Sequence, residues 1–203
     1  TPALLRHRSM DASGGCRAGG WPWIDFEEIA VKVLGISGSP RREGNTEILV
    51  KLGLEVLAQQ GVETEYLSLA DHPVKPCLAC GGCAKPGAQG CVQNDPAFEG
   101  MVQRFQASDG FLIGSPVYFG SATPQTMSLL DRIGYVSRCQ GNFLRHKVGA
   151  AIVVARRAGQ NFTFAQLNYF FLISEMIVPG STYWNVAVGR EKGEVQNDAE
   201  GMT

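Results

Sequence analysis

The chain has 203 residues, with 18 Lys and Arg against 19 Asp and Glu and a formal net charge of −1. A chain of this length predicts one domain with its own core, or one domain with an appendage. The nearly neutral charge gives no electrostatic reason to bind nucleic acid or an anionic membrane. No apolar run is long enough to cross a bilayer, so we expect neither nucleic acid nor a membrane as a partner.

The first 29 residues differ in composition from the rest of the chain. They are rich in glycine, contain Trp-Pro-Trp at 21–23 and have neither a helical nor a strand period. We therefore predict an N-terminal appendage over 1–29 and one domain over 30–203. The start of the chain lacks the charged-then-apolar pattern of a secretory signal. We expect a cytoplasmic protein with reduced thiols.

The domain begins with a strand–loop–helix–strand pattern. Residues 31–37 form a β-branched apolar run, which is typical of a strand buried on both faces of a parallel sheet. After the polar loop 38–45, apolar residues recur at three- and four-residue spacing from Thr46 until Gly61 ends the helix. The alternating residues 62–69 predict a second strand, which completes a βαβ unit.

The remainder of the chain continues the same alternation. Periodicity predicts helices over 96–106, 124–138 and 160–176, strands over 111–117, 148–155 and 181–188, and the opening of another helix over 198–203. Five strands alternating with helices predict an open, doubly wound α/β sheet. One topology of this class has strand order 2-1-3-4-5 and binds its ligand at the carboxyl edge of the strands. The loops expected to meet there are 37–46, 115–123 and 155–161.

The loop over 37–46 has the features of a phosphate site. It precedes a helix, whose first N–H groups and positive dipole end attract anions. Hydroxyl, amide and guanidinium donors are supplied by Ser37, Ser39, Asn45, Thr46 and either Arg41 or Arg42. The loop matches neither the Walker A pattern nor the dinucleotide fingerprint. The alternative is an ordinary turn in which Asn45 or Thr46 caps the helix.

A second candidate site is the cysteine loop, residues 77–91, which follows the second predicted strand. Cys77, Cys80, Cys83 and Cys91 fall within fifteen residues, which indicates ligand clustering rather than a disulfide framework. A [4Fe–4S] cluster takes four thiolates. Zinc also accepts four cysteines, although structural zinc sites usually pair two separated knuckles. Disulfides would need an oxidising compartment. We favour the cluster, and Cys139 is not expected to be a ligand.

Three motifs in this order resemble a known family. Gly-Ile-Ser-Gly-Ser-Pro-Arg at 35–41 is followed by Asn-Thr at 45–46 and then by Gly-Ser-Pro-Val-Tyr-Phe-Gly-Ser at 114–121. Together they resemble the flavodoxin-like, NADPH-dependent FMN reductase superfamily. The cysteine loop between them is similar to that of the iron–sulfur flavoproteins within it. The resemblance covers roughly residues 31–203 and leaves the first thirty unmatched.

The resemblance implies FMN as cofactor, with its phosphate in the 37–46 loop, its ring against 116–120 and a third wall from 155–159. The cofactor-binding residues that it implies are Ser37, Ser39, Pro40, Arg41, Asn45, Thr46, Pro116, Val117, Tyr118, Phe119, Gly120, Ala155 and Arg156. A positive charge from Arg156 or Arg157 near the flavin would raise its reduction potential. The alternative for both arginines is a solvated turn.

The resemblance further implies a [4Fe–4S] cluster on the four cysteines and a homodimer or homotetramer. Electrons would pass from a ferredoxin-like donor through the cluster and FMN to a small acceptor such as O₂, peroxide or a quinone. An alternative is an NAD(P)H-dependent FMN or quinone reductase whose cysteine loop is structural, with zinc or nothing bound. A third is a redox or metal sensor without turnover. No acid–base pair or triad suggests hydrolysis.

Overall fold

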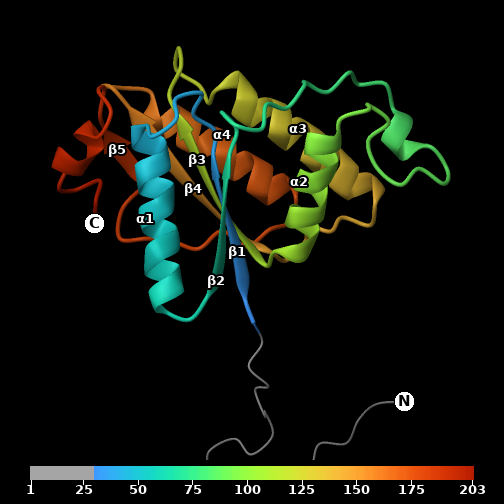
Figure 1. Ribbon diagram of the computed structural model, residues 1–203, viewed down its shortest axis with the longest axis horizontal. Helices are drawn as coiled ribbons and strands as arrows, with labels where there is room; N and C mark the ends of the chain where they lie inside the picture. The colour runs from blue at the N-terminus through green and yellow to red at the C-terminus, as the bar shows by residue number, and fades with distance from the viewer. Residues whose placement is uncertain (1–29) are drawn as a thin grey trace, which may run out of the picture.

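The computed structural model describes residues 30–203, so the predicted appendage over 1–29 lies outside the described residues. A five-stranded parallel sheet forms the centre of the domain (Figure 1). Its strands are β1 (Lys32–Ser37), β2 (Glu63–Ser68), β3 (Gly110–Pro116), β4 (Val148–Ala155) and β5 (Val186–Val188). Their order is β2-β1-β3-β4-β5, and every neighbouring pair is parallel. The predicted doubly wound topology is confirmed.

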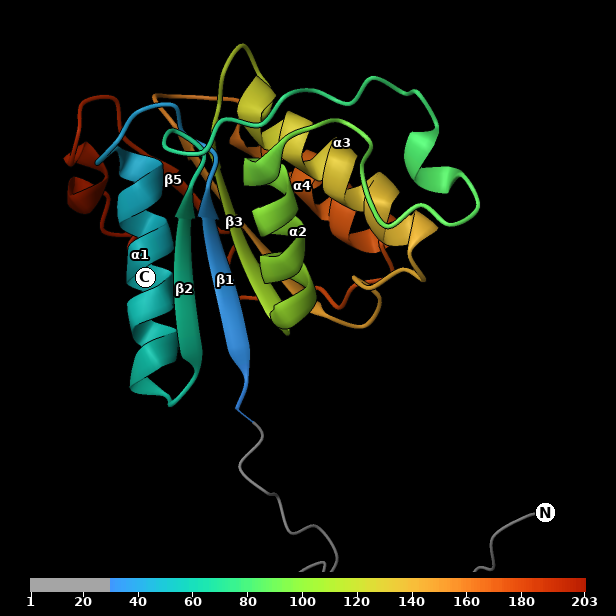
Figure 2. The ribbon, with the colours of Figure 1, turned by 45° about the vertical axis from the view of Figure 1, so that its right-hand side comes forward.

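Helices cover both faces of this sheet (Figure 2). Helix α1 (Asn45–Gln59) lies on one face, and the other face carries α2 (Pro96–Ala107), α3 (Pro124–Cys139) and α4 (Gln160–Ile173). On the α1 face the contact is close, because a Cβ on Gly35 would lie 2.5 Å from Leu54. On the other face, Leu34 and Ile36 are fully buried. Burial on both faces explains why β1, β3 and β4 read as nearly continuous apolar runs.

The larger core lies between the sheet and helices α2, α3 and α4. It includes Phe98 and Phe105 of α2, Ile133 of α3 and Phe171 of α4, none of which is exposed to solvent. A smaller core under α1 consists of Leu49, Val154, Ala187 and Val195. Full burial of one such side chain contributes roughly 1.5–3 kcal/mol, so these clusters fix the helices on the sheet.

Two boundaries differ from the sequence prediction. Helix α4 ends at Ile173, because Glu175 takes a left-handed φ of 58° and Ile177 then bridges Val148 of β4. The fifth strand, expected over 181–188, is limited to the three residues of β5. At the end of the chain, the short 3₁₀ helix η2 (Glu194–Asn197) precedes a single turn, in which the Asp198 carbonyl accepts a hydrogen bond from Met202.

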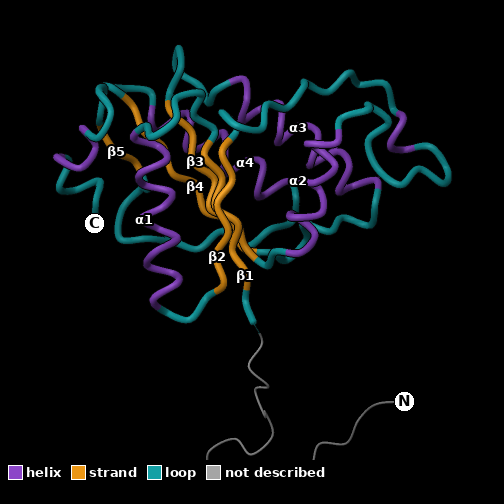
Figure 3. The backbone as a smooth tube through the Cα atoms, in the orientation of Figure 1, coloured by secondary structure: helices purple, strands orange, loops and turns teal. Residues whose placement is uncertain are grey.

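The segment between β2 and α2 is long and mostly irregular (Figure 3). Its one regular element is the 3₁₀ helix η1 (Gly82–Ala84), which lies inside the cysteine loop. The figures show this segment leaving the carboxyl edge of the sheet and extending past α2 and α3. No helix within residues 30–203 combines the length and apolar character needed to cross a membrane.

Candidate functional site

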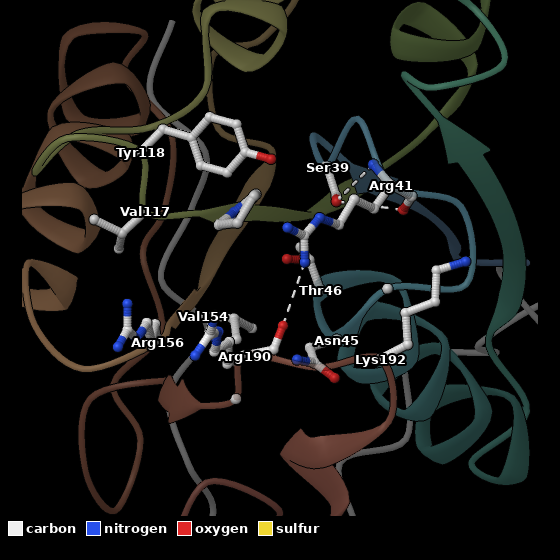
Figure 4. Close-up of a pocket in the computed structure, with 13 residues that line it drawn as sticks. Ser39, Arg41, Asn45, Thr46, Val117, Tyr118, Val154, Arg156, Arg190 and Lys192 are labelled. Carbon is white, nitrogen blue, oxygen red and sulfur yellow. Dashed lines mark hydrogen bonds between the residues drawn. The ribbon is translucent and has the colours of Figure 1, made fainter.

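A pocket of about 290 Å³ lies at the carboxyl edge of the strands (Figure 4). Its wall consists of Ser39, Arg41, Gly44, Asn45 and Thr46 from the first loop, Pro116, Val117 and Tyr118 after β3, Val154 and Arg156 at the end of β4, and Gly189, Arg190 and Lys192 after β5. The first three groups come from the loops that the topology rule predicts to meet. The fourth was not predicted from the sequence.

The N-terminus of α1 opens on this pocket without a side-chain cap. The residue before the helix is Gly44, and no side chain accepts a hydrogen bond from the first turn. Asn45 and Thr46 are already helical residues, so the alternative prediction of an ordinary capped turn is wrong. By contrast, α2 and α3 are capped by Asp95 and Thr123. The free N–H groups of α1 are therefore available to an anion.

The loop before α1 is held in a tight conformation. The Ser39 hydroxyl accepts a hydrogen bond from the Arg41 N–H at 3.1 Å, and Gly38 donates to the Gly114 carbonyl at 2.8 Å. A Cβ on Gly38 would lie only 1.8 Å from the Thr126 hydroxyl, so no larger residue fits here without a shift. These contacts hold the loop against β3 and the start of α3.

The charged residues that line the pocket are all cationic: Arg41, Arg156, Arg190 and Lys192. Arg41 donates from Nη1 to the Arg190 carbonyl at 3.3 Å (Figure 4). Its neighbour Arg42 turns away and pairs with Asp71 at 2.6 Å. Guanidinium groups beside free helix N–H groups favour a phosphate. The arrangement is suited to an anionic ligand group.

The loop after β3 forms a tight turn at the rim of the pocket. Tyr118 and Ser121 exchange backbone hydrogen bonds of 2.9 and 3.1 Å. The two residues between them, Phe119 and Gly120, have φ values of 51° and 85°. A non-glycine residue with positive φ is uncommon, and Phe119 is also fully exposed. This turn presents an aromatic side chain to solvent beside the pocket.

Several predicted cofactor residues do not line the pocket. Ser37 and Ala155 are buried within their strands, whereas Pro40, Phe119 and Gly120 face solvent.

Asn45 lies at the wall, but its side chain fastens the segment after β5. Its Nδ2 donates to the Glu191 carbonyl at 2.9 Å, and its Oδ1 accepts from the Val195 N–H at 3.4 Å. This contact brings Arg190 and Lys192 to the pocket. The rule that parallel strands share a carboxyl edge could have identified these two residues, because they follow the last strand.

The cysteine loop has a different character. The five cysteines within residues 30–203 are free thiols. Cys77 and Cys80 are exposed, whereas Cys83 and Cys91 are partly buried against the core. Burial raises the pKa of the Cys83 thiol, and the nearby sulfurs of Cys139 and Cys91 raise it further. The structure thus places Cys139, at the end of α3, beside the cysteine loop.

The four loop cysteines do not form a preassembled cage. Within residues 30–203, no three His, Cys, Asp or Glu side chains are arranged to hold a metal ion. Two of the sulfurs nevertheless accept hydrogen bonds, Cys77 from the Ala79 N–H at 3.4 Å and Cys91 from Arg132 Nη2 at 3.3 Å. Such N–H···S bonds stabilise the thiolates of iron–sulfur sites. The donor set therefore fits a thiolate-ligated cluster.

Cys83 and the pocket lie toward opposite ends of α3, and Cys91 lies beside the middle of the helix. At its N-terminus, the Thr123 hydroxyl donates to the Gly38 carbonyl of the loop before α1 at 2.6 Å. At its C-terminus, Cys139 lies near Cys83. A helix of 16 residues is about 24 Å long. The cysteine loop thus begins at the carboxyl edge of the sheet, where the pocket lies, but Cys83 lies near the far end of α3.

Comparison with known proteins agrees with this geometry. The family model for NADPH-dependent FMN reductase matches residues 31–191. An iron–sulfur flavoprotein of Methanocaldococcus jannaschii is 41% identical over 184 residues, which cover 85% of this chain and 90% of that protein. An iron–sulfur flavoprotein of Methanosarcina thermophila is 37% identical over 153 residues, or 74% of this chain and 78% of that protein.

Solved structures support the fold alone. The Trp repressor binding protein from Bacillus subtilis has a TM-score of 0.60 at 15% identity, covering 84% of this chain and 92% of that one. An archaeal flavodoxin has a TM-score of 0.54 at 13% identity, covering 85% and 94%. The fold, the motifs and the sequence relatives agree: the chain belongs to the NADPH-dependent FMN reductase family, in which it groups with the iron–sulfur flavoproteins, and it is a flavin-dependent oxidoreductase.

Proposed function

We propose that this protein binds FMN in the basic pocket and a [4Fe–4S] cluster on Cys77, Cys80, Cys83 and Cys91, and that it relays electrons between them. The observation that carries the FMN assignment is the uncapped N-terminus of α1 in a pocket whose charged lining residues are all cationic. The observation that supports the cluster assignment is the set of four free thiols, two of which already accept hydrogen bonds from N–H groups.

Each part of the pocket has a defined task in this proposal. The first N–H groups of α1 and the Arg41 guanidinium hold the phosphate. Pro116, Val117 and Tyr118 form the wall for the flavin ring, and Arg156 places a positive charge at the pocket. Bound FMN would supply one- and two-electron chemistry, whereas the protein supplies position and electrostatics.

The donor that we propose is a ferredoxin-like protein, and the acceptor is a small molecule such as O₂, peroxide or a quinone. Because Cys83 lies near the far end of α3 from the pocket of the same chain, the relay fits an assembly of two or four copies. In such an assembly the cysteine loop of one subunit would approach the pocket of another. Four free thiols suit a reducing compartment such as the cytoplasm.

The second candidate is an NAD(P)H-dependent FMN or quinone reductase with a structural cysteine loop. It is favoured by the family description and by the absence of a gathered set of metal ligands within residues 30–203. In that case the cationic rim formed by Arg190 and Lys192 would also serve the phosphates of the nicotinamide donor.

The experiment is anaerobic purification followed by visible spectroscopy and analysis of iron, sulfide, zinc and flavin. The proposal predicts FMN together with about four irons and four sulfides per chain, from the composition of the cluster. Flavin without iron would contradict the relay. Mixing with NADPH under argon then separates the donors: rapid bleaching of the flavin favours the reductase, whereas bleaching only with reduced ferredoxin favours the relay.

A further inference from the structure

Arg132 neither lines the pocket nor belongs to the loop cysteines, but it is a charged residue buried in the core. It lies in the middle of α3, and only 1% of the residue is exposed. Arginine is almost never fully buried unless it is paired, because removing its charge from water is costly. A charge buried this deeply needs partners, and its partners indicate its role.

The partners of Arg132 lie on both sides of the cysteine loop. Nη1 donates to Asp95 Oδ2 at 2.6 Å and to the Lys75 carbonyl at 3.3 Å. The guanidinium carbon lies 3.7 Å from the centre of the Phe98 ring. Lys75 lies two residues before the first loop cysteine, and Asp95 lies four residues after the last. One side chain on α3 thus joins the entry of the loop to its exit.

The second arm of the guanidinium contacts the loop itself. Nη2 donates to Cys91 Sγ at 3.3 Å, a sulfur that is 41 residues away in the sequence. Cys91 and Arg132 therefore meet only because the loop folds back onto α3. Cys91 also lines a cleft of about 730 Å³ between the loop and α2. The hydrogen bond from Arg132 holds this sulfur against α3.

We propose that Arg132 is the positioning residue of the cysteine loop: it clamps the two ends of the loop and holds Cys91 as a cluster ligand through an N–H···S bond. The inference rests on the proposed cluster. The planar fork of arginine suits this task, because one arm can bind a carboxylate while the other binds the sulfur. A lysine offers a single point charge, which Asp95 would occupy.

The proposal gives Arg132 an electronic effect as well as a structural one. Hydrogen bonds and positive charge at the ligand sulfurs stabilise the reduced, more negative cluster. Removing them shifts the reduction potential to more negative values. A residue that only packed the loop would leave the potential of any remaining cluster unchanged, so the potential distinguishes the two roles.

The test compares Arg132→Lys and Arg132→Met with the wild-type protein after anaerobic purification. The measurements are iron and sulfide per chain, the half-life of the cluster in the presence of an iron chelator, its midpoint potential, and FMN content. Arg132→Lys is expected to keep FMN and to lose iron at least about tenfold faster than the wild type, because it loses one charge-assisted hydrogen bond. Its midpoint potential is expected to shift to more negative values. Arg132→Met is expected to lose the cluster.

Arg138→Met is the matched control. Arg138 lies on the same helix but is exposed, and its Nη2 donates to the Ile173 carbonyl at the end of α4. This variant is expected to match the wild type in all four measurements. Hydrogen–deuterium exchange of residues 75–95 adds a readout that needs no iron, and Arg132→Lys is expected to speed it.

Each outcome has a distinct meaning. A wild-type protein that holds FMN and iron while Arg132→Lys retains its cluster lifetime, potential and exchange rates overturns the role of Arg132 alone. A wild-type protein that holds FMN but no iron overturns the cluster and, with it, the ligand role. If Arg132→Met fails to fold, as shown by the absence of FMN, the result for Arg132→Lys alone decides whether Arg132 positions the cysteine loop.

Discussion

The pocket and the cysteine loop are built in contrasting ways. The pocket is assembled from the carboxyl ends of parallel strands and the start of α1, so most of its shape follows from the backbone of the sheet. The cysteine loop has one short 3₁₀ helix and is attached to α3 by side chains, chiefly Arg132. The pocket is therefore preorganised, whereas the loop depends on a few contacts and, in the proposed function, on the cluster that it would bind.

This contrast is tested most strongly by removing one loop thiol. Cys80→Ser is expected to abolish cluster binding and to leave FMN content at the wild-type level, because Cys80 is exposed and contributes nothing to the sheet. Iron and sulfide analysis together with visible spectra measure the outcome. Cys139→Ser is the control and should keep its iron. Loss of FMN in Cys80→Ser would mean that the two regions fold as one unit.

Removing the Asp95 carboxylate tests how strongly the cysteine loop is held on α3. In Asp95→Asn, the buried Arg132 loses its carboxylate at 2.6 Å. We expect the free energy of unfolding to fall by about 3 kcal/mol, which is typical when one partner of a buried ion pair is removed. Chemical denaturation measures it. A fall below about 0.5 kcal/mol would show that the loop is held by other contacts.

The environment of Asp95 also makes the stability of the fold depend on pH. Burial acts to raise the pKa of Asp95, but hydrogen bonds from Arg132 and the Phe98 N–H outweigh it, and the pKa is lowered. A carboxyl with a lowered folded pKa stabilises the fold above its unfolded pKa of about 3.9, and this contribution is lost as pH falls through the folded value. Wild type should therefore lose stability below about pH 4 more steeply than Asp95→Asn.

The smallest effect is expected at the pocket rim. Replacing both Arg190 and Lys192 by glutamine is predicted to weaken FMN binding about tenfold, as the loss of one charge-assisted hydrogen bond implies. Binding of riboflavin, which lacks the phosphate, should be unchanged. Titration of the protein stripped of flavin measures both. Arg157→Gln, outside the pocket wall, is the control. Equal weakening for riboflavin would show that the segment after β5 shapes the ring site instead.

Sequence periodicity was sufficient for the sheet. Apolar runs identify β1, β3 and β4 within a few residues, because strands buried on both faces require such runs. Alternation of polar and apolar residues identifies β2, which is partly exposed. The fifth strand was overestimated, since only Val186–Val188 pair with β4. The topology rule also placed three of the four pocket segments at one edge, because parallel strands all end there.

Other features depended on contacts between distant residues. The segment after β5 reaches the pocket through Asn45, from which Glu191 is separated by 146 residues. Cys139 lies beside Cys83 only because α3 passes under the loop. No local pattern indicates where the cysteines lie relative to the pocket. The fourth wall was missed, although the rule that parallel strands share a carboxyl edge could have identified it.

By itself, the sequence therefore determined the strands of the sheet, the polar loop before α1 and the four clustered thiols, because each follows from local spacing of residues along the chain. The tertiary structure alone decided how these parts lie relative to one another. It left α1 uncapped toward the pocket and buried Arg132 between the two ends of the cysteine loop. The burial of Arg132 follows from long-range packing, which selects partners by shape and charge rather than by nearness in sequence.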